Sequence, residues 1–258
     1  MNIQELSKTK AANWSNLNSQ KFRLKNNCFI AEGRKCVADT FPHFNPVALI
    51  ISDSFPLSDT DFRDIISTAD KKNILFSASD KMISKISNLS TPSDIIAIYS
   101  LPTTTRTPIP IIDSPILLLD GIQDPGNMGT IIRTAHWFGL KHIFCSKNCV
   151  DIFNPKCVQS TMGSIAAVDI IYTDLDKIID ENPEREVCGL LLEGEDIFLS
   201  KLPENPFIIM GNEGKGISQH LRDKITSPLT IPPADPNSHP DSLNVAIATA
   251  ITLAFFKK

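Results

Sequence analysis

The sequence lacks several features that would assign it to other protein classes. It contains no apolar run of about 18 residues, so a membrane-spanning helix is not expected. Its first residues are polar and lack the apolar core of a signal peptide, so we expect a cytoplasmic protein. Its six cysteines form no C-x-x-C pair, which favours reduced thiols packed as small apolar residues over a structural zinc site. No metal is therefore expected.

An overall excess of positive charge is also missing. The net charge is −4, which at first sight argues against a nucleic-acid partner. The distribution of charge matters more, because residues 1–36 hold seven basic and two acidic side chains and leave −9 on the rest of the chain. A basic arm on an acidic body can direct a polyanion to one face, although a solvated helical surface is an alternative. The basic residues of this arm are Lys8, Lys10, Lys21, Arg23, Lys25, Arg34 and Lys35.

A proline- and threonine-rich stretch divides the chain. Residues 101–114 show little apolar periodicity and are typical of an extended linker. The linker separates a region over residues 1–100 from a larger one over residues 115–258. With 42% apolar and 21% charged residues, the chain has enough apolar material for a real core in a globular protein.

Helical and strand patterns alternate in both regions, which predicts an α/β fold. In the first region we expect helices over 4–18, 59–69 and 79–87, and strands over 46–52, 73–77 and 94–100. In the second region the predicted strands are apolar on both faces, which indicates a parallel sheet covered on both sides. Those strands are 116–120, 141–145, 167–172, 187–192, 207–211 and 229–231, with helices over 128–138, 155–162, 218–225 and 242–256.

Three polar, turn-rich segments follow strands of the second region, where ligands bind in parallel sheets. In residues 120–135 a turn with glycine and proline leads into a helix that we expect Asn127 to cap. Arg133 then lies near an apolar face, where an arginine is unusual. Residues 208–218 contain three glycines, which allow close backbone approach to a ligand. Residues 231–246 form an irregular loop before the last helix, and Ser242 is a candidate cap for that helix.

Nucleotide-binding motifs do not explain the glycines of the second segment. A phosphate-binding P-loop needs Ser or Thr directly after Gly-Lys, and here Gly216 follows Lys215. The dinucleotide-binding G-x-G-x-x-G spacing is missing as well. The hypothesis of a nucleotide-dependent enzyme therefore rests on residues 211–216 alone and is the weakest of the three.

Taken in order, the three segments carry the motifs N-x-G-x-I-x-R, G-N-E-G-x-G and I-P…S-L-N-V. This ordered set resembles the SpoU/TrmH family of RNA ribose 2'-O-methyltransferases, part of the SPOUT superfamily, over roughly residues 115–257. Residues 1–100 are more weakly similar to the small RNA-binding domain, of ribosomal-protein (L30e-like) fold, that precedes the catalytic domain in many members. The basic arm fits that role.

The resemblance implies a fold, a cofactor and a set of site residues. It implies a parallel-sheet domain with a deep trefoil knot, S-adenosylmethionine as methyl donor, a homodimer, and an RNA substrate, with ribosomal RNA favoured over transfer RNA. In the family, the residue that corresponds to Arg133 is the candidate for activating the 2'-hydroxyl. Because an arginine is not deprotonated in proteins, we interpret Arg133 as a fixed cation that is oriented by its neighbours and paired with Glu213. The implied catalytic residues are Asn127, Arg133, Glu213, Ser242 and Asn244, and the implied cofactor-binding residues are Leu191, Gly194, Gly211, Ile231 and Leu243.

The loop before Ser242 departs from the family pattern. Nine residues separate Pro232 from Ser242, about three more than the usual spacing, and prolines replace the common methionine-glycine pattern. This loop contacts the cofactor in relatives. The sequence therefore leaves a second hypothesis open, that of an RNA-binding protein that keeps the fold without catalysis.

Overall fold

The computed structural model describes residues 1–102, 114–235, 237–238 and 240–256, so the predicted linker lies almost entirely outside the described residues. The chain divides into two compact units. The N-terminal unit comprises Met1–Thr107 and Asp151–Ala166, and the C-terminal unit comprises Pro108–Val150 and Ala167–Lys258. Residues 151–166 thus pack with the N-terminal unit, whereas the sequence places them in the second region. The domain boundaries themselves stay a prediction.

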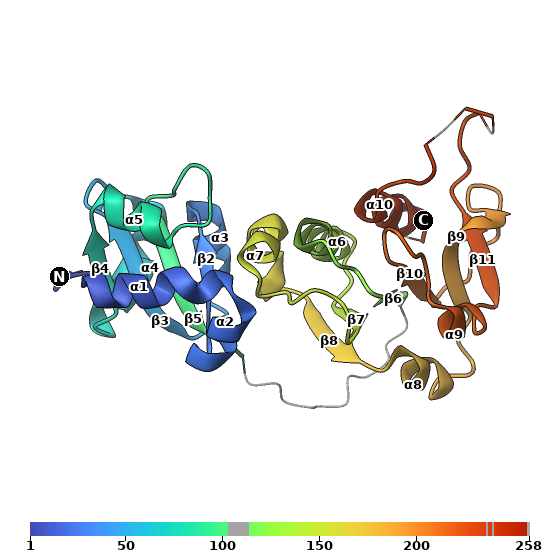
Figure 1. Ribbon diagram of the computed structural model, residues 1–258, viewed down its shortest axis with the longest axis horizontal. Coiled ribbons are helices and arrows are strands. Elements are labelled where there is room, and N and C mark those ends of the chain that lie inside the picture. The colour runs from blue at the N-terminus through green and yellow to red at the C-terminus, as the bar shows by residue number, and fades with distance from the viewer. Residues whose placement is uncertain (103–113, 236, 239, 257–258) are drawn as a thin grey trace. The chain divides into compact units, whose positions relative to one another are not determined.

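The N-terminal unit is built on a five-stranded sheet in the order β1-β4-β3-β5-β2 (Figure 1). Strand β5 runs antiparallel to both β3 and β2, and the other pairs are parallel. Four of the five strands are almost wholly buried, which explains their continuous apolar sequences. The strands are β1 (Gln4–Glu5), β2 (Cys28–Glu32), β3 (Pro46–Ser52), β4 (Leu75–Ala78) and β5 (Ile95–Ser100).

Helices cover this sheet. One core cluster joins Ala11 of α1 and Ile83 of α5 to alternate residues of the strands, including Ile50 and Ile98. Phe29 of β2 points to the opposite face and contacts Phe153 at 4.6 Å between ring centroids, which anchors residues 151–166 to the sheet. The helices are α1 (Lys8–Ser15), η1 (Asn16–Asn18), α2 (Gln20–Asn26), α3 (Arg34–Thr40), η2 (Thr60–Phe62), α4 (Arg63–Lys71), α5 (Asp80–Ile86), α7 (Pro155–Thr161) and η3 (Ser164–Ala166).

The C-terminal unit contains a parallel six-stranded sheet in the order β11-β9-β10-β6-β7-β8. The α/β architecture with a parallel sheet is confirmed, and each of the six predicted strands is present with shifted ends. The strands are β6 (Ile116–Leu119), β7 (His142–Ser146), β8 (Asp169–Thr173), β9 (Val187–Asp196), β10 (Phe207–Met210) and β11 (Ser227–Thr230). The trefoil knot stays a prediction.

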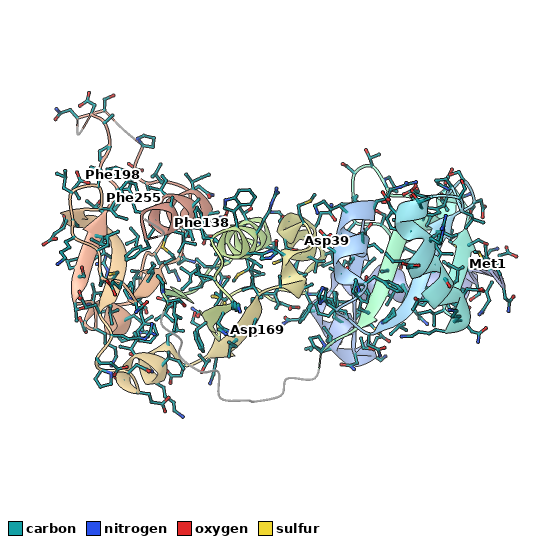
Figure 2. The ribbon with its side chains drawn as sticks, turned by 180° about the vertical axis from the view of Figure 1, so that it is seen from behind. Met1, Asp39, Phe138, Asp169, Phe198 and Phe255 are labelled. Atoms are coloured by element: carbon teal, nitrogen blue, oxygen red, sulfur yellow. The ribbon has the colours of Figure 1, made fainter. Side chains whose placement is uncertain are left out.

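Helices lie on both faces of this sheet (Figure 1). Ile179 of α8 and Leu221 of α9 share a core cluster with Ile116 and Leu118 of β6. Helices α6 and α10 pack against each other on the other side. Near the end of α10, the ring of Phe255 contacts that of Phe198 at a tilt of 60°, with centroids 4.8 Å apart (Figure 2). The helices are α6 (Pro125–Trp137), α8 (Leu175–Asp180), α9 (Gln219–Arg222) and α10 (Val245–Phe256).

Within the described ranges, no helix is both long enough and apolar enough to cross a membrane.

Candidate active site

The second and third motif segments meet at one pocket of the C-terminal unit, beside β9 and at the carboxyl ends of β10 and β11, and the first segment is joined to the second by hydrogen bonds. The pocket has a volume of about 560 Å³, within the usual range for small-molecule sites. Seven consecutive residues, Met210 to Gly216, form the longest single stretch of its wall. The other lining residues are Leu190, Leu191, Leu192, Arg222, Thr230, Ile231, Asp241, Ser242, Leu243, Val245 and Ala248.

The pocket contains most of the predicted cofactor-binding residues. Leu191, Gly211, Ile231 and Leu243 all line it, together with Glu213 and Ser242 of the predicted catalytic set. Gly194 does not. A Cβ on Gly194 would lie 2.8 Å from the carbonyl carbon of Leu229, so this glycine is needed for close packing of β9 against β11.

Asn127 is not the cap of α6, contrary to the sequence interpretation. The cap is Asp124, whose carboxylate accepts a hydrogen bond from the Asn127 backbone N–H at 2.8 Å. Pro125 follows at the first helical position, where its missing N–H costs nothing. The helix therefore begins three residues earlier than predicted, and the Asn127 side chain is free for other contacts.

Those contacts join the three motif segments. The Asn127 side-chain amide donates to Oε1 of Glu213 at 3.0 Å, and its carbonyl oxygen accepts from Nδ2 of Asn244 at 2.9 Å. The three residues come from positions separated by 86 and 117 residues in sequence. They form one polar chain that fixes the second and third segments to the start of α6.

Asn244, rather than Ser242, caps the last helix. Its Oδ1 accepts from the backbone N–H groups of Ala246 and Ile247 at 3.0 and 3.3 Å, and α10 begins at Val245. An asparagine at this position satisfies the unpaired N–H groups of the first turn. Ser242 is left in the loop, where it lines the pocket.

The glycine-rich second segment is a closed turn. Asn212 and Gly216 exchange two backbone hydrogen bonds, of 3.0 and 2.9 Å. The Asn212 side chain accepts from the N–H groups of Gly214 and Lys215 and donates to the Gly121 carbonyl at 2.7 Å, which ties the second segment to the first. Asn212 is part of the second motif in the sequence, but no role was predicted for it. Its place after the buried strand β10 is the signal that could have found it.

A buried carboxylate adds a second link between these segments. Asp120, at the end of β6, is 6% exposed and accepts from the Ser218 backbone N–H at 2.7 Å. Ser218 is also the cap residue of α9. The bond therefore joins the start of the first segment to the end of the second.

Arg133 does not line the pocket. It lies on the exposed side of α6, and within the described part of the chain it makes no hydrogen bond or ion pair. The expected pairing with Glu213 is absent from the structure, where Glu213 accepts from Asn127. Arg133 is thus separate from the Glu213–Asn127–Asn244 chain.

One thiol beside the first segment has an altered acidity. Cys149 accepts from the Ile122 N–H and contacts the Ser146 hydroxyl and the Leu119 carbonyl. The hydrogen bond with Cys145, followed by those with Ser146 and the backbone, lowers the pKa of Cys149 to about 7 against the opposing effect of burial. Among the described residues, no group of three or more His, Cys, Asp or Glu side chains could hold a metal ion.

Comparison with known proteins identifies relatives of both parts of the chain. The SpoU rRNA Methylase family model matches residues 114–254, and a model of the MRM3-like substrate binding domain matches residues 8–97. The chain is 28% identical to the Bacillus subtilis 23S rRNA (guanosine(2553)-2'-O)-methyltransferase RlmP, and the match covers 96% of each protein.

Solved structures agree over nearly the whole chain. A TrmH-family protein from Porphyromonas gingivalis is 32% identical with a TM-score of 0.77, covering 97% of this chain and 98% of its own. An AdoMet-bound rRNA methyltransferase from Sinorhizobium meliloti is 26% identical with a TM-score of 0.82, covering 99% of this chain and 96% of its own.

The fold and the site thus define an RNA methyltransferase preceded by a substrate-binding domain. The chain belongs to the SpoU rRNA Methylase family. The family resemblance inferred from the three motifs is confirmed.

Proposed function

We propose that this protein transfers the methyl group of S-adenosylmethionine to a ribose 2'-hydroxyl of ribosomal RNA. The observation that carries the proposal is that the second and third family motifs line one pocket, and that the first motif is joined to both of them by the Glu213–Asn127–Asn244 chain. The Bacillus subtilis relative, which this chain matches over 96% of its length, is named as a 23S rRNA 2'-O-methyltransferase. That name supports ribosomal RNA as the methyl acceptor. Large-subunit ribosomal RNA is therefore the first substrate to test.

The pocket residues fit S-adenosylmethionine chemically. Apolar side chains such as Leu191, Met210 and Ile231 suit an adenine ring and its ribose. The carboxylate of Glu213 suits the cationic groups of the donor, while the guanidinium of Arg222 suits its carboxylate.

The donor supplies an already activated methyl group when it is bound. What remains for the protein is to align the ribose oxygen with that methyl, since a new O–C bond forms as the S–C bond breaks and the hydroxyl proton leaves. Alignment can lower a barrier by about 7–11 kcal/mol in favourable cases. For this purpose Asn127, itself bonded to Asn244, holds Glu213 in the pocket wall, and Ser242 offers a hydroxyl to the donor or to the ribose.

Arg133 acts as a fixed cation that favours alkoxide character on the ribose oxygen and holds the adjacent phosphate. Arg133 lies outside the pocket of its own protomer, which supports a site in a homodimer where the pocket of one protomer is completed by Arg133 of the other. Helix α10 is apolar on all sides, and Ile247 is 51% exposed, while Trp137 at the end of α6 is 85% exposed. An apolar helix with a solvent-facing side favours a partner surface. The partner in this proposal is a second copy of the chain.

The test combines donor binding, methyl transfer and cellular mapping. Wild-type protein should bind S-adenosylmethionine in calorimetry and transfer labelled methyl to a 23S rRNA transcript, and Arg133→Ala should abolish transfer while donor binding is retained. Loss of one 2'-O-methyl position in total RNA from cells without the gene would identify the nucleotide. Absence of donor binding would refute the proposal.

Mixing two inactive variants tests the composite site. Arg133→Ala and Glu213→Ala protomers should together regain about one quarter of wild-type activity, because half of the dimers are mixed and each has one intact site of two. If no activity is recovered, Arg133 acts on the pocket of its own protomer and the composite site is refuted.

The alternative is an RNA-binding protein without catalysis, favoured by the altered loop between Pro232 and Ser242. Tight RNA binding with no labelled methyl on any transcript would favour it over the enzyme.

A further inference from the structure

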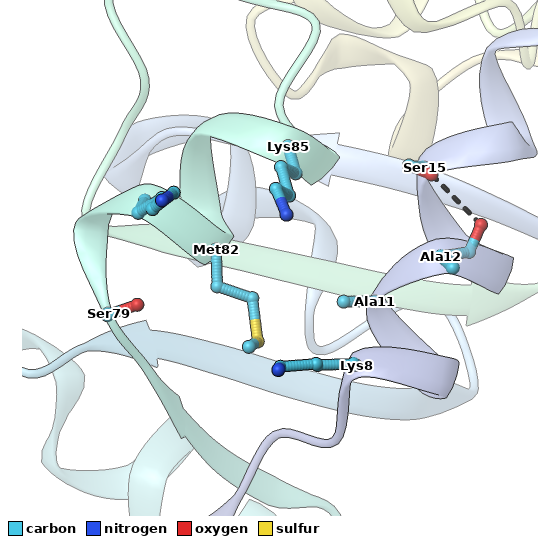
Figure 3. A pocket seen from close by; sticks show the side chains of 8 residues that line it. Lys8, Ala11, Ala12, Ser15, Ser79, Met82 and Lys85 are labelled. Atoms are coloured by element: carbon cyan, nitrogen blue, oxygen red, sulfur yellow. Dashed lines mark hydrogen bonds between the residues drawn. The ribbon is translucent and has the colours of Figure 1, made fainter.

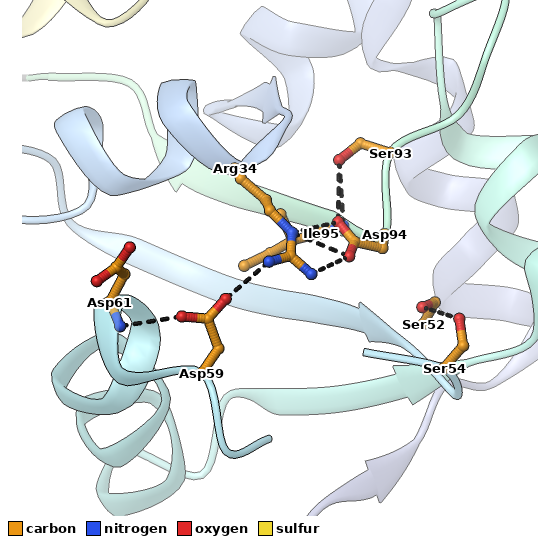
Figure 4. Close-up of polar contacts among 8 residues, drawn as sticks. All are labelled: Arg34, Ser52, Ser54, Asp59, Asp61, Ser93, Asp94 and Ile95. Carbon is orange, nitrogen blue, oxygen red and sulfur yellow. Dashed lines mark hydrogen bonds and ion pairs between the residues drawn. The ribbon is translucent and has the colours of Figure 1, made fainter. Parts of the chain in front are cut away.

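Three of the seven basic residues of the arm expected from the sequence are neutralised in the fold. Arg23 is 2% exposed and pairs with Asp151 at 2.7 Å. Arg34 donates to both Asp59 and Asp94, as the close-up in Figure 4 shows. These side chains hold the N-terminal unit together and are not available to a polyanion.

Lys35 is occupied as well, because it pairs with Asp39 one helical turn away at 2.8 Å. Of the seven basic residues of the arm, Arg23, Arg34 and Lys35 are therefore paired internally. Lys10 is placed over the Phe76 ring at 4.2 Å. The charge count of residues 1–36 thus overstates what the surface offers.

A positive surface that combines Lys8 of the arm with lysines of α5 lies where α1 packs against α5. A cavity of about 550 Å³ lies there, lined by Lys8 of α1 and by Lys81 and Lys85 of α5 (Figure 3). All three side chains are exposed, and none makes an ion pair or hydrogen bond within the described ranges. More than 70 residues separate Lys8 from the two lysines of α5 in sequence. We call this concavity the α1/α5 groove.

The remaining lining residues are small, apolar or hydroxylic. They are Ala11, Ala12, Ser15, Ser79 and Met82, and among the residues that the structure describes no acidic side chain lines the groove. Asp80 lies beside it in the first turn of α5, where a carboxylate is stabilised by the helix dipole. Lys81 and Lys85 are one turn apart on the same side of α5, so two ammonium groups stand along one wall and the third faces them.

We propose that the α1/α5 groove binds the sugar-phosphate backbone of the RNA substrate. Three ammonium groups without protein partners supply the charge that phosphates require, while the floor of Ala11, Ala12 and Met82 offers a surface for ribose. Contacts of this kind position an RNA without reading its sequence. The inference rests on the proposed function, since it assigns this surface to the RNA that the enzyme methylates.

A matched pair of double variants tests the groove in the full-length protein. Lys81→Gln with Lys85→Gln removes two groove charges, and Lys21→Gln with Lys25→Gln removes two exposed charges at the same spacing on α2, which do not line the groove. Affinity for a fluorescent 23S rRNA transcript is measured at several salt concentrations.

The groove variant should bind the transcript about ten- to a hundredfold more weakly than wild type, and its slope of log affinity against log salt should be shallower by about 1.5. Adding Lys8→Gln should bring the change in slope to about 2 to 3. The α2 variant should stay within about threefold of wild type. Thermal unfolding of each variant checks that the fold is retained, as expected for exposed positions.

Kinetics separate this inference from the proposed function. For the groove variant the KM for RNA should rise while kcat and donor binding stay unchanged, because the groove is not part of the methyl-transfer pocket. Equal loss of affinity in both double variants, or no loss in the groove variant, overturns the inference and leaves the proposed function intact. Failure of the wild-type protein to methylate any RNA refutes the proposed function, and the binding comparison still decides on the groove.

Discussion

Replacing Gly211 with alanine should open the glycine-rich turn of the donor pocket. A Cβ at this position would lie 2.7 Å from the Gly216 carbonyl oxygen and closer still to the Gly216 carbonyl carbon and the Ile217 nitrogen. Ordinary contacts between such atoms are about 3.5–4.0 Å. The obstacle is backbone rather than a flexible side chain, so the turn must move. Gly211 is not among the residues with positive φ, and the overlap alone makes alanine unfavourable.

The cost follows from what that movement breaks. Overpacking of this kind costs about 1–3 kcal/mol. The two backbone hydrogen bonds between Asn212 and Gly216 each contribute about 0.5–1.5 kcal/mol. The closed turn should therefore be less stable by about 2–6 kcal/mol. Since the donor binds the closed turn in our proposal, even 2 kcal/mol corresponds to about thirtyfold weaker binding.

Isothermal titration calorimetry with S-adenosylmethionine measures this effect, and the neighbouring Gly214 provides the control. A Cβ on Gly214 would meet only the Asn212 side-chain oxygen, at 3.8 Å, which is an ordinary contact. Gly214→Ala should therefore bind the donor within a few-fold of wild type. The reasoning is refuted if Gly211→Ala binds the donor as wild type does, or if both variants lose affinity equally.

Three further experiments test other parts of the structure. Arg23→Met leaves the Asp151 carboxylate unpaired and should cost about 3–5 kcal/mol in urea unfolding, whereas Arg34→Met, at a half-exposed pair, should cost about 1 kcal/mol; equal costs would contradict the role of burial. The folded pKa of Cys149, about 7, is below its ordinary value of 9.0, so its thiolate stabilises the fold fully above pH 9 and this contribution is lost as pH falls through 7. The unfolding free energy of wild type minus that of Cys149→Ser should accordingly rise from pH 7 to 9, and a flat difference would show that the thiol does not ionise. Asn127→Ala should lower methyl transfer at least about tenfold with a stability change near 1 kcal/mol, and unchanged transfer would remove Asn127 from the positioning chain.

The sheet of the C-terminal unit could be predicted because its strands are buried on both faces. A run such as Ile116–Leu119 is apolar at every position, and all four residues are buried in the structure. The strands of the N-terminal unit were harder to predict from the sequence. Strand β2 was not predicted, although all five of its residues are buried, because Cys28–Glu32 ends in a charged residue. The carboxylate of Glu32 is accommodated by Ser87 and Asn88, contacts that a local pattern does not reveal.

The motif segments could be found from the sequence, but the partners of their side chains could not. Asn127 and Ser242 are both acceptable helix caps by residue type, yet Asp124 and Asn244 cap the helices instead. Which polar residue caps a helix depends on where the first turn begins, and Pro125 moves that point for α6. The links among Asn127, Glu213 and Asn244 span the whole unit and depend on the sheet order.

The same reasoning applies to charge, where counting along the chain predicted a basic N-terminal arm. An arginine near a carboxylate in space is neutralised whatever its neighbours in sequence are, as Arg23 is by a residue 128 positions away. Conversely, the packing of α1 on α5 gathers lysines from two distant segments into one groove. Since phosphate binding depends on the local concentration of unpaired positive charge rather than on net charge, an acidic protein can bind RNA through such a surface. The net charge of −4 is therefore compatible with an RNA substrate.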